Sequence, residues 1–450
     1  MISQRCNCWK RRAKSLDAIL MLHQLRQGIK GNKQEVVDIL YLFVLQGVNK
    51  FLPFLVIPYL MVKLGATGYG YIGFSLSVIQ YLALIIDFGF DLSATKHLAI
   101  AGEDKQERTR IFWAVFWAKT ILLAASLLLL FILIAFVPTF KSYQAAILAT
   151  TPMAIGSTYT FMWLFQGVGK VRAMAIINTI SKLLLLPLIF IFVKVQDDYI
   201  IAALLQASVF CLTALISSVW AYRQSWIGSI SWDFSRIKSE VSDSFPLFLS
   251  RASTSVYTQL FVIILGFFCS QSAVGRYTSA EALMRALCFI IYIPITQVFF
   301  PKISALSTKD RVAAVNKTKS VLYVVGGIML LLTILLFVGA SLLKSALHDE
   351  GYLGWDNLLR IISPTPLFIG IGAVCGQMGL IALGNKQSRI HFRNVYVITA
   401  VISIPAVGIL TPLYAEYGAA WALLLSEAIV AALMFYYCKK DQVLCCSLPS

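Results

Sequence analysis

IFWAVFWAKTILLAASLLLLFILIAFV, residues 111–137, contains a single charged residue, Lys119. The hydrocarbon core of a bilayer is about 30 Å thick, and an α-helix needs about 20 apolar residues to cross it. A helix also satisfies its own backbone hydrogen bonds, which lipid cannot do. The stretch therefore predicts a membrane-spanning helix.

Similar apolar runs precede and follow this one along the chain. The 450 residues are 59% hydrophobic and only 13% charged, and the mean hydropathy is +0.78. Ordinary soluble domains are about 25% charged, so a water-soluble globular protein is excluded. The sequence predicts an all-α integral membrane protein with about twelve transmembrane helices, at residues 37–62, 71–95, 111–137, 143–166, 173–194, 199–221, 244–268, 277–300, 320–343, 358–383, 394–411 and 417–438.

Lysine and arginine are distributed unevenly between the two sides of this predicted bundle. Of the 38 in the chain, 27 lie in the terminal tails and the loops after even-numbered spans, and 6 lie in the loops after odd-numbered spans. Loops rich in positive charge face the cytoplasm, so we expect both termini there. The net charge of +17 thus lies in short loops beside anionic lipid, which argues against nucleic-acid binding.

A polar segment divides the predicted spans into two sets of six. We expect a basic cytoplasmic tail at 1–36, an N-terminal lobe at 37–221, an inter-lobe linker at 222–243, a C-terminal lobe at 244–438 and a cytoplasmic tail at 439–450. Both sets enter the membrane in the same orientation, as parallel repeats require. A faint internal similarity agrees with this, since GYIGFS from Gly70 and GRYTSA from Gly275 align at an offset of 205.

Five cations lie inside the predicted spans, where a central Lys or Arg costs roughly 2.5 to 3.5 kcal/mol. Lys50 and Lys182 lie near mid-span, which favours an interior position. Lys119 and Arg251 lie closer to the cytoplasmic end, so that snorkelling to the headgroups remains an alternative. Interior cations suit an anionic substrate such as a phosphate or a pyrophosphate. The candidate substrate-binding residues are Lys50, Lys119, Lys182, Arg251 and Arg285.

Carboxylates in the spans are candidates for coupling transport to an ion: Asp87, Glu281 and Glu427. Glu281 lies one helical turn before Arg285, and we expect the two to pair. Glu427 has apolar neighbours and is either a proton-binding carboxylate or the partner of an interior cation. The nine cysteines include no C-x-x-C pair, and we assign neither a metal nor a cofactor.

Two blocks of the sequence resemble a known family. The first comprises QGVNKFLPFLVIPYLMVKLGATGYGYIGFS (46–75) and DFGFDLSATKHLA (87–99). The second comprises FPLFLSRASTSVYTQLFVIILGFFCSQSAVGRYTSAEALMRAL (245–287) and PITQVFFPKIS (294–304). Both resemble Wzx-type O-antigen and polysaccharide flippases of the multidrug/oligosaccharidyl-lipid/polysaccharide (MOP) exporter superfamily. The likeness extends over residues 36–440.

The resemblance implies two lobes around a central cavity that faces alternate sides of the bacterial cytoplasmic (inner) membrane. The substrate implied is an oligosaccharide linked to undecaprenyl pyrophosphate, and a polysaccharide polymerase and chain-length proteins are implied as candidate partners. Lys50, Arg251, Glu281 and Arg285 lie in the matching blocks, whereas Lys119 and Lys182 do not.

Other functions remain open at this stage. A multidrug or cation antiporter of the same superfamily predicts more interior carboxylates than cations. A membrane-embedded polymerase or glycosyltransferase predicts a long outer loop with catalytic side chains, whereas the longest outer loop here, 344–357, is short. The sequence also has no P-loop, HExxH or G-x-S-x-G motif, and we expect a transporter rather than an enzyme.

Overall fold

A computed structural model describes residues 33–444, with side chains described for 53–249, 252 and 259–444. Most of the predicted basic tail, residues 1–32, lies outside this range. The chain divides into two units, Met1–Lys50 and Phe51–Ser450. In the first unit residues 33–50 are helical. The description below concerns the second unit.

Helices and short connections make up the N-terminal half. In chain order they are α2 (Lys33–Asp87), α3 (Phe90–Ala101), α4 (Lys105–Phe136), α5 (Pro138–Ser142), α6 (Gln144–Thr150), α7 (Pro152–Thr158), α8 (Met162–Gly167), α9 (Val171–Phe192), η1 (Gln196–Asp198) and α10 (Tyr199–Arg223).

The C-terminal half has fewer and longer helices. They are α11 (Phe234–Phe268), α12 (Gln271–Ser307), α13 (Arg311–Ser345), η2 (Glu350–Tyr352), α14 (Trp355–Ile362), α15 (Thr365–Ala373), the π-helix η3 (Val374–Leu383) and α16 (Lys386–Lys440).

Polar residues in the short loops fix where several helices begin. Asp104 accepts hydrogen bonds from the backbone N–H groups of Gln106 and Glu107 at the start of α4. Asp233, Asp310 and Asn385 cap α11, α13 and α16 in the same way. An N-cap side chain satisfies backbone donors that have no partner within the helix, and this matters most at a membrane boundary.

Backbone breaks divide two long helices into hairpins. In α2 the chain turns at Gly65, where φ is +62°, and in α16 it turns at Ala415, where φ is +51°. The predicted fourth and tenth spans are each broken into shorter helices. Pro152 lies in the first turn of α7 and Pro366 in that of α15, because a proline is tolerated there but ends a preceding helix.

Eight helical stretches within the described residues are long and apolar enough to cross a membrane. Two of them, Pro53–Ala101 and Lys386–Lys440, contain the turns at Gly65 and Ala415. The segments α5 to α8 and the helix α11 occupy the two remaining predicted spans, at 143–166 and 244–268. The prediction of an all-α membrane protein with about twelve transmembrane helices is confirmed.

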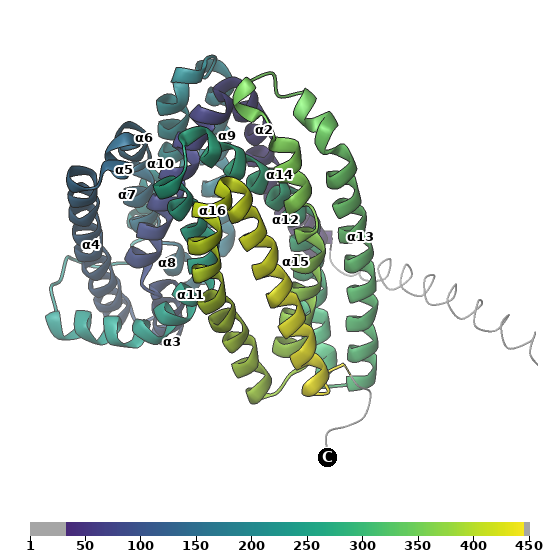
Figure 1. Cartoon of the computed structure of the whole chain (residues 1–450). Coiled ribbons are helices and arrows are strands. Elements are labelled where there is room, and N and C mark those ends of the chain that lie inside the picture. The colour runs from purple at the N-terminus through teal and green to yellow at the C-terminus, as the bar shows by residue number, and fades with distance from the viewer. Residues whose placement is uncertain (1–32, 445–450) are drawn as a thin grey trace, which may run out of the picture. The chain divides into compact units, whose positions relative to one another are not determined.

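The second unit forms two lobes, here called the N-lobe (residues 51–223) and the C-lobe (α11 to α16). In the N-lobe α10 packs against α6, α7 and α9, and in the C-lobe α16 packs against α11, α15 and η3. Figure 1 shows α4 to α8 on the left, α13 to α15 on the right and α16 at the centre. The beginning of α11 also packs against α3 and α4 of the N-lobe.

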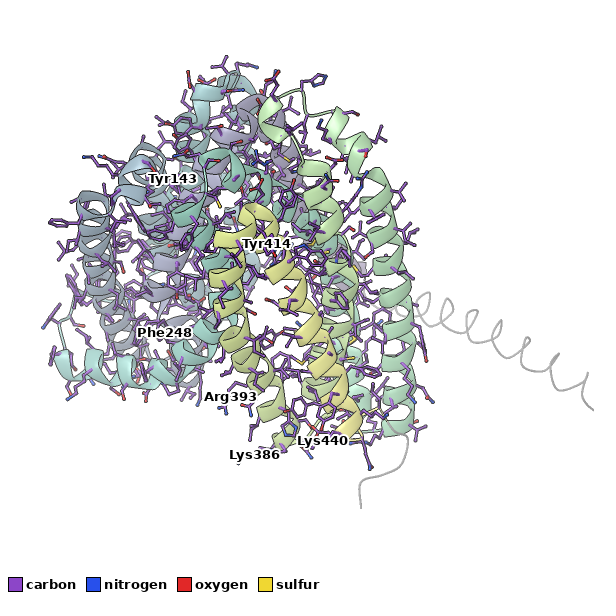
Figure 2. The ribbon with its side chains drawn as sticks, viewed as in Figure 1. Tyr143, Phe248, Lys386, Arg393, Tyr414 and Lys440 are labelled. Atoms are coloured by element: carbon purple, nitrogen blue, oxygen red, sulfur yellow. The ribbon has the colours of Figure 1, made fainter. Side chains whose placement is uncertain are left out.

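The two ends of the bundle differ in charge. The basic end carries the loops at 102–104, 224–233, 308–310 and 384–385, and Figure 2 shows Lys386, Arg393 and Lys440 there, at the bottom of the view. The opposite end carries the loops at 193–195, 269–270 and 346–354, and Tyr143 and Tyr414 lie toward it.

Candidate functional site

A polar cavity of about 360 Å³ lies in the N-lobe and reaches α11 of the C-lobe. The second half of α2 contributes most of one wall. Eight hydroxyl, amide and charged side chains gather in it, beside six apolar or aromatic ones. The lining residues are Gln80, Ala83, Leu84, Ile86, Asp87, Asp91, Lys119, Ser157, Thr158, Thr160, Met162, Trp163, Phe210 and Gln259.

Lys119 is an interior cation of this cavity. Its Nζ donates to Oδ1 of Asp87 at 2.8 Å, and the Lys119 side chain is only 5% exposed. Asp87 ends α2 and lies on a different helix from Lys119, so the ion pair joins α2 to α4. A buried ammonium group needs such a partner, because leaving it without one costs several kcal/mol. Of the two alternatives for Lys119, the structure has the interior one.

A second charged cluster lies in the C-lobe. Nε of Arg285 donates to Oε1 of Glu281 at 2.8 Å, as the sequence predicted. Nη1 of Arg285 lies 3.7 Å from Oε1 of Glu427 on the second half of α16. The side chains are 19%, 10% and 7% exposed for Arg285, Glu281 and Glu427 respectively. Glu427 therefore lies within ion-pair distance of an interior cation; proton binding by Glu427 and its role in ion coupling stay predictions.

Of the other three predicted cations, only Lys182 has a described side chain. Lys182 is half-buried on α9 and does not line the cavity. Lys50 belongs to α2 and Arg251 to α11, but the side chains of both lie outside the described residues. Substrate binding by these three residues stays a prediction, as it does for Lys119 and Arg285.

In both the N-lobe cavity and the C-lobe cluster, the cation lies beside carboxylates. The cavity brings Lys119 together with Asp87 and Asp91, and the C-lobe cluster brings Arg285 together with Glu281 and Glu427. Each cation is thus held by carboxylates in the structure. An incoming phosphate would have to replace a carboxylate as the partner of the cation.

At the opposite end, α2 and α12 cross in direct backbone contact. A Cβ on Gly70 would overlap the carbonyl oxygen of Gln271, and a Cβ on Gly275 would overlap that of Ala66. Gly70 and Gly275 are the two positions that align at an offset of 205, and so are Ala66 and Gln271. The crossing therefore relates the two lobes by an approximate two-fold symmetry, and only glycine fits on either side of it.

The loop before α14 reinforces this closure. Oδ2 of Asp349 accepts a hydrogen bond from the backbone N–H of Ala66 at 2.8 Å, at the start of the second half of α2. Arg276 holds the same loop from inside the C-lobe: its Nη1 donates to the carbonyl of Gly351 at 2.9 Å, and its Nη2 to Glu416 at 2.6 Å. Asp349 therefore ties the C-lobe to the N-lobe.

At the basic end, the first turns of α11 are fixed to the N-lobe. Oε2 of Glu240 lies 2.8 Å from Nδ1 of His97 on α3, and Nη2 of Arg236 lies 2.9 Å from Glu107 on α4. The hydroxyls of Ser244 and Ser93 are 2.5 Å apart. Residues 234–244 lie within the predicted inter-lobe linker or border it, and they pack on the N-lobe.

Sequence reasoning missed several of these contacts. Asp349, Glu416 and Glu240 were not among the residues that the sequence singled out. The pairing partners are far apart in the chain, and nothing in the local sequence marks them. The glycine crossing did have a signal in the sequence, since Gly70 and Gly275 begin the two similar segments.

The chain matches the family model described as "Polysaccharide biosynthesis protein" over residues 36–307. The chain belongs to this family. It is 31% identical to a "Putative O-antigen transporter" of Escherichia coli (strain K12) over 91% of this chain and 98% of that protein. A protein of the same name from Shigella dysenteriae is 27% identical over 88% and 98%. The expected likeness to O-antigen and polysaccharide transporters is confirmed.

Solved structures share the fold of this chain. The lipid II flippase MurJ, in an inward closed conformation, has a TM-score of 0.71 at 13% identity and covers 89% of this chain and 87% of its own. An inward-facing multidrug resistance transporter of the MATE family, also of the MOP superfamily, has a TM-score of 0.63 at 13% identity and covers 88% and 98%. The predicted two-lobed fold is confirmed by these likenesses.

Proposed function

We propose that this protein is a flippase for undecaprenyl-pyrophosphate-linked oligosaccharide repeat units. It moves them from the inner to the outer leaflet of the bacterial cytoplasmic membrane by alternating access. The basic end faces the cytoplasm, together with both termini. The observation that carries the proposal is a polar cavity with a buried lysine, in a chain 31% identical to a named O-antigen transporter.

The cavity supports binding of an anionic, sugar-bearing head group. Lys119 provides a buried positive charge, and Ser157, Thr158, Gln80 and Gln259 provide hydroxyl and amide groups of the kind that hydrogen-bond to sugars. A phosphate oxygen takes the place of the Asp87 carboxylate on Lys119, so that the ammonium group stays paired throughout. Exchange of one anion for another avoids the cost of a bare buried charge.

The closed crossing at the opposite end supports alternating access. Where α2 and α12 meet, the contact is made by backbone and by the small residues Gly70, Gly73, Gly275 and Thr278. Opening must also separate aromatic contacts beside the crossing, since the ring of Phe74 on α2 packs on Gly266 of α11 and the ring of Phe140 lies 6.0 Å from that of Phe267. In the closed arrangement substrate enters from the basic end, and opening of the crossing releases it on the other side.

Carboxylates are the proposed coupling groups. Protonation of Glu427 or Glu281, or binding of a cation there, weakens the ion pair of that carboxylate with Arg285. Protonation of Asp87, or binding of a cation there, weakens its ion pair with Lys119 in the same way. Each event frees a cation for the substrate. Coupling of this kind needs no catalytic residue, in keeping with a transporter rather than an enzyme.

Deletion of the gene from its own bacterium tests the proposal. We expect loss of the surface polysaccharide and accumulation of undecaprenyl-pyrophosphate-linked repeat units on the inner leaflet, both reversed by a plasmid copy. A deletion strain that keeps its surface polysaccharide and accumulates no lipid-linked intermediate contradicts it. Accumulation of single repeat units on the outer leaflet would instead indicate the polymerase alternative.

A further inference from the structure

An apolar groove of about 560 Å³ opens on the outside of the C-lobe, away from the polar centres. Its walls come from α13, α15 and the second half of α16. Both large apolar residues and small ones line it, the small ones including Gly326, Gly327, Ala428 and Ala432, and Tyr323 and Phe435 lie toward its basic end. Tyr323 is 78% exposed and Phe435 50%, so large apolar surfaces border an open channel.

Glycines explain both the depth of the groove and its opening. A Cβ on Gly370 of α15 would lie 2.8 Å from the side chain of Met329, so α13 and α15 pack closely behind the groove. A Cβ on Gly326 or Gly327 would have no atom within 4 Å. The two glycines thus face empty space, where an ordinary spanning helix would present Leu or Ile to the lipid.

Positive charge lies at one end of this apolar channel. Lys319 precedes Tyr323 by one helical turn on α13, and Lys439 follows Phe435 by one turn on α16. Residues four apart share a helix face, so both lysines continue the faces that form the groove. Both lie toward the basic end, because α13 runs away from that end and the second half of α16 runs toward it.

The length of the groove is close to the hydrocarbon thickness of one leaflet. Leu322 to Leu330 span about 12 Å along α13, at 1.5 Å per residue. One leaflet contributes roughly 15 Å of hydrocarbon. A fatty acyl chain fits this depth, and the phosphate of its head group would then reach the level of the lysines. A much longer polyprenyl chain would extend past the groove.

We propose that this groove is a binding site for an anionic phospholipid of the leaflet at the basic end. One acyl chain lies along Gly326 and Gly327, and the head-group phosphate is held by Lys319 and Lys439. Anionic lipid is attracted to lysines at this depth, and apolar burial holds the chain. The site is separate from the proposed transport cavity and does not depend on the proposed function.

Native mass spectrometry of the full-length purified protein tests the site. The protein is titrated with phosphatidylglycerol or phosphatidylethanolamine carrying the same acyl chains. The variant Gly326→Leu/Gly327→Leu fills the groove, and Gly339→Leu is its control, because Gly339 also faces open space on α13 but lies outside the groove. Lys319→Ala/Lys439→Ala removes the charges, and Lys105→Ala/Lys386→Ala removes two cations elsewhere at the basic end.

We expect the wild type and both controls to retain one tightly bound phosphatidylglycerol. The groove-filling variant should lose this lipid. In the lysine variant the preference for phosphatidylglycerol over phosphatidylethanolamine should be about tenfold smaller than in the wild type. Thermal unfolding checks that each variant is folded. The proposal is overturned if the groove-filling variant keeps the lipid, if both lipids bind equally to the wild type, or if undecaprenyl phosphate displaces phosphatidylglycerol from the groove.

Discussion

Lys119 shows how this bundle keeps a positive charge away from water. Its side chain is 5% exposed, and Asp87, its partner at 2.8 Å, is 24% exposed. Arg285 has the same relation to Glu281 and Glu427. A pair of this kind stabilises little by itself, but the loss of one partner leaves a buried charge at a cost of about 3–5 kcal/mol. Removal of one partner should therefore destabilise the protein more than removal of both, and single and double variants can measure the difference.

The variant Asp87→Asn should unfold at a clearly lower temperature than the wild type, because it leaves the Lys119 ammonium group without its carboxylate. The double variant Asp87→Asn/Lys119→Gln should recover most of that stability, since the unpaired Lys119 charge is removed as well. Polysaccharide export should stay low in the double variant if Lys119 binds substrate. The measurements are thermal unfolding of the purified protein and the amount of surface polysaccharide. A double variant with full export would show that Lys119 is a structural cation.

At the scale of helices, the crossing of α2 and α12 holds the opposite end closed. The helices approach so closely at Gly70 and Gly275 that each position excludes a side chain. Asp349 adds a hydrogen bond to Ala66 beside the crossing. At the basic end the first turns of α11 are bound to α3 and α4. A relative motion of the lobes would therefore carry residues 234–244 with the N-lobe.

Gly275→Ala should prevent complete closure at the opposite end, because the added Cβ overlaps the carbonyl oxygen of Ala66. We expect export to fall at least tenfold. In a background without native cysteines, Thr278→Cys reports on the opening: Thr278 is 7% exposed in the closed arrangement, and a thiol at this position should react with water-soluble reagents only when the crossing opens.

Gly339→Ala is the matched control for this prediction, since a Cβ there meets no atom within 4 Å. Combined with Thr278→Cys, it should leave both export and thiol labelling as in the parent. Normal export in the Gly275→Ala variant, with the thiol introduced by Thr278→Cys still protected, would mean that the crossing is not part of the transport cycle.

At the scale of the whole molecule, the distribution of lysine and arginine predicts the orientation in the membrane. With 27 of these residues in the tails and the loops after even-numbered predicted spans and 6 in the loops after odd-numbered ones, reporter fusions after Lys319 and Lys440 should read cytoplasmic. A fusion after Gly354, in the loop at the opposite end, should read periplasmic. Alkaline phosphatase and green fluorescent protein provide complementary signals. A periplasmic signal from the Lys440 fusion would contradict the orientation.

Local composition was sufficient for much of the fold. The apolar run at 111–137 became α4, and the hairpins at Gly65 and Ala415 lie between predicted spans. Hydropathy works at this level because a helix in lipid must satisfy its own backbone and present apolar side chains, and both requirements are met residue by residue. The pair of Glu281 and Arg285 was predictable for the same reason, since one helical turn joins them.

The sequence by itself determined that this protein is a membrane bundle of about twelve helices, that it resembles polysaccharide flippases, and that several interior residues are charged. Only the tertiary structure decided which charges meet: Lys119 with Asp87, Arg285 with Glu427, and Asp349 with the backbone of Ala66. It also brought Gly70 against Gly275. Such contacts depend on how separate helices cross, and crossing geometry follows from packing over many residues at once rather than from the pattern within any one of them.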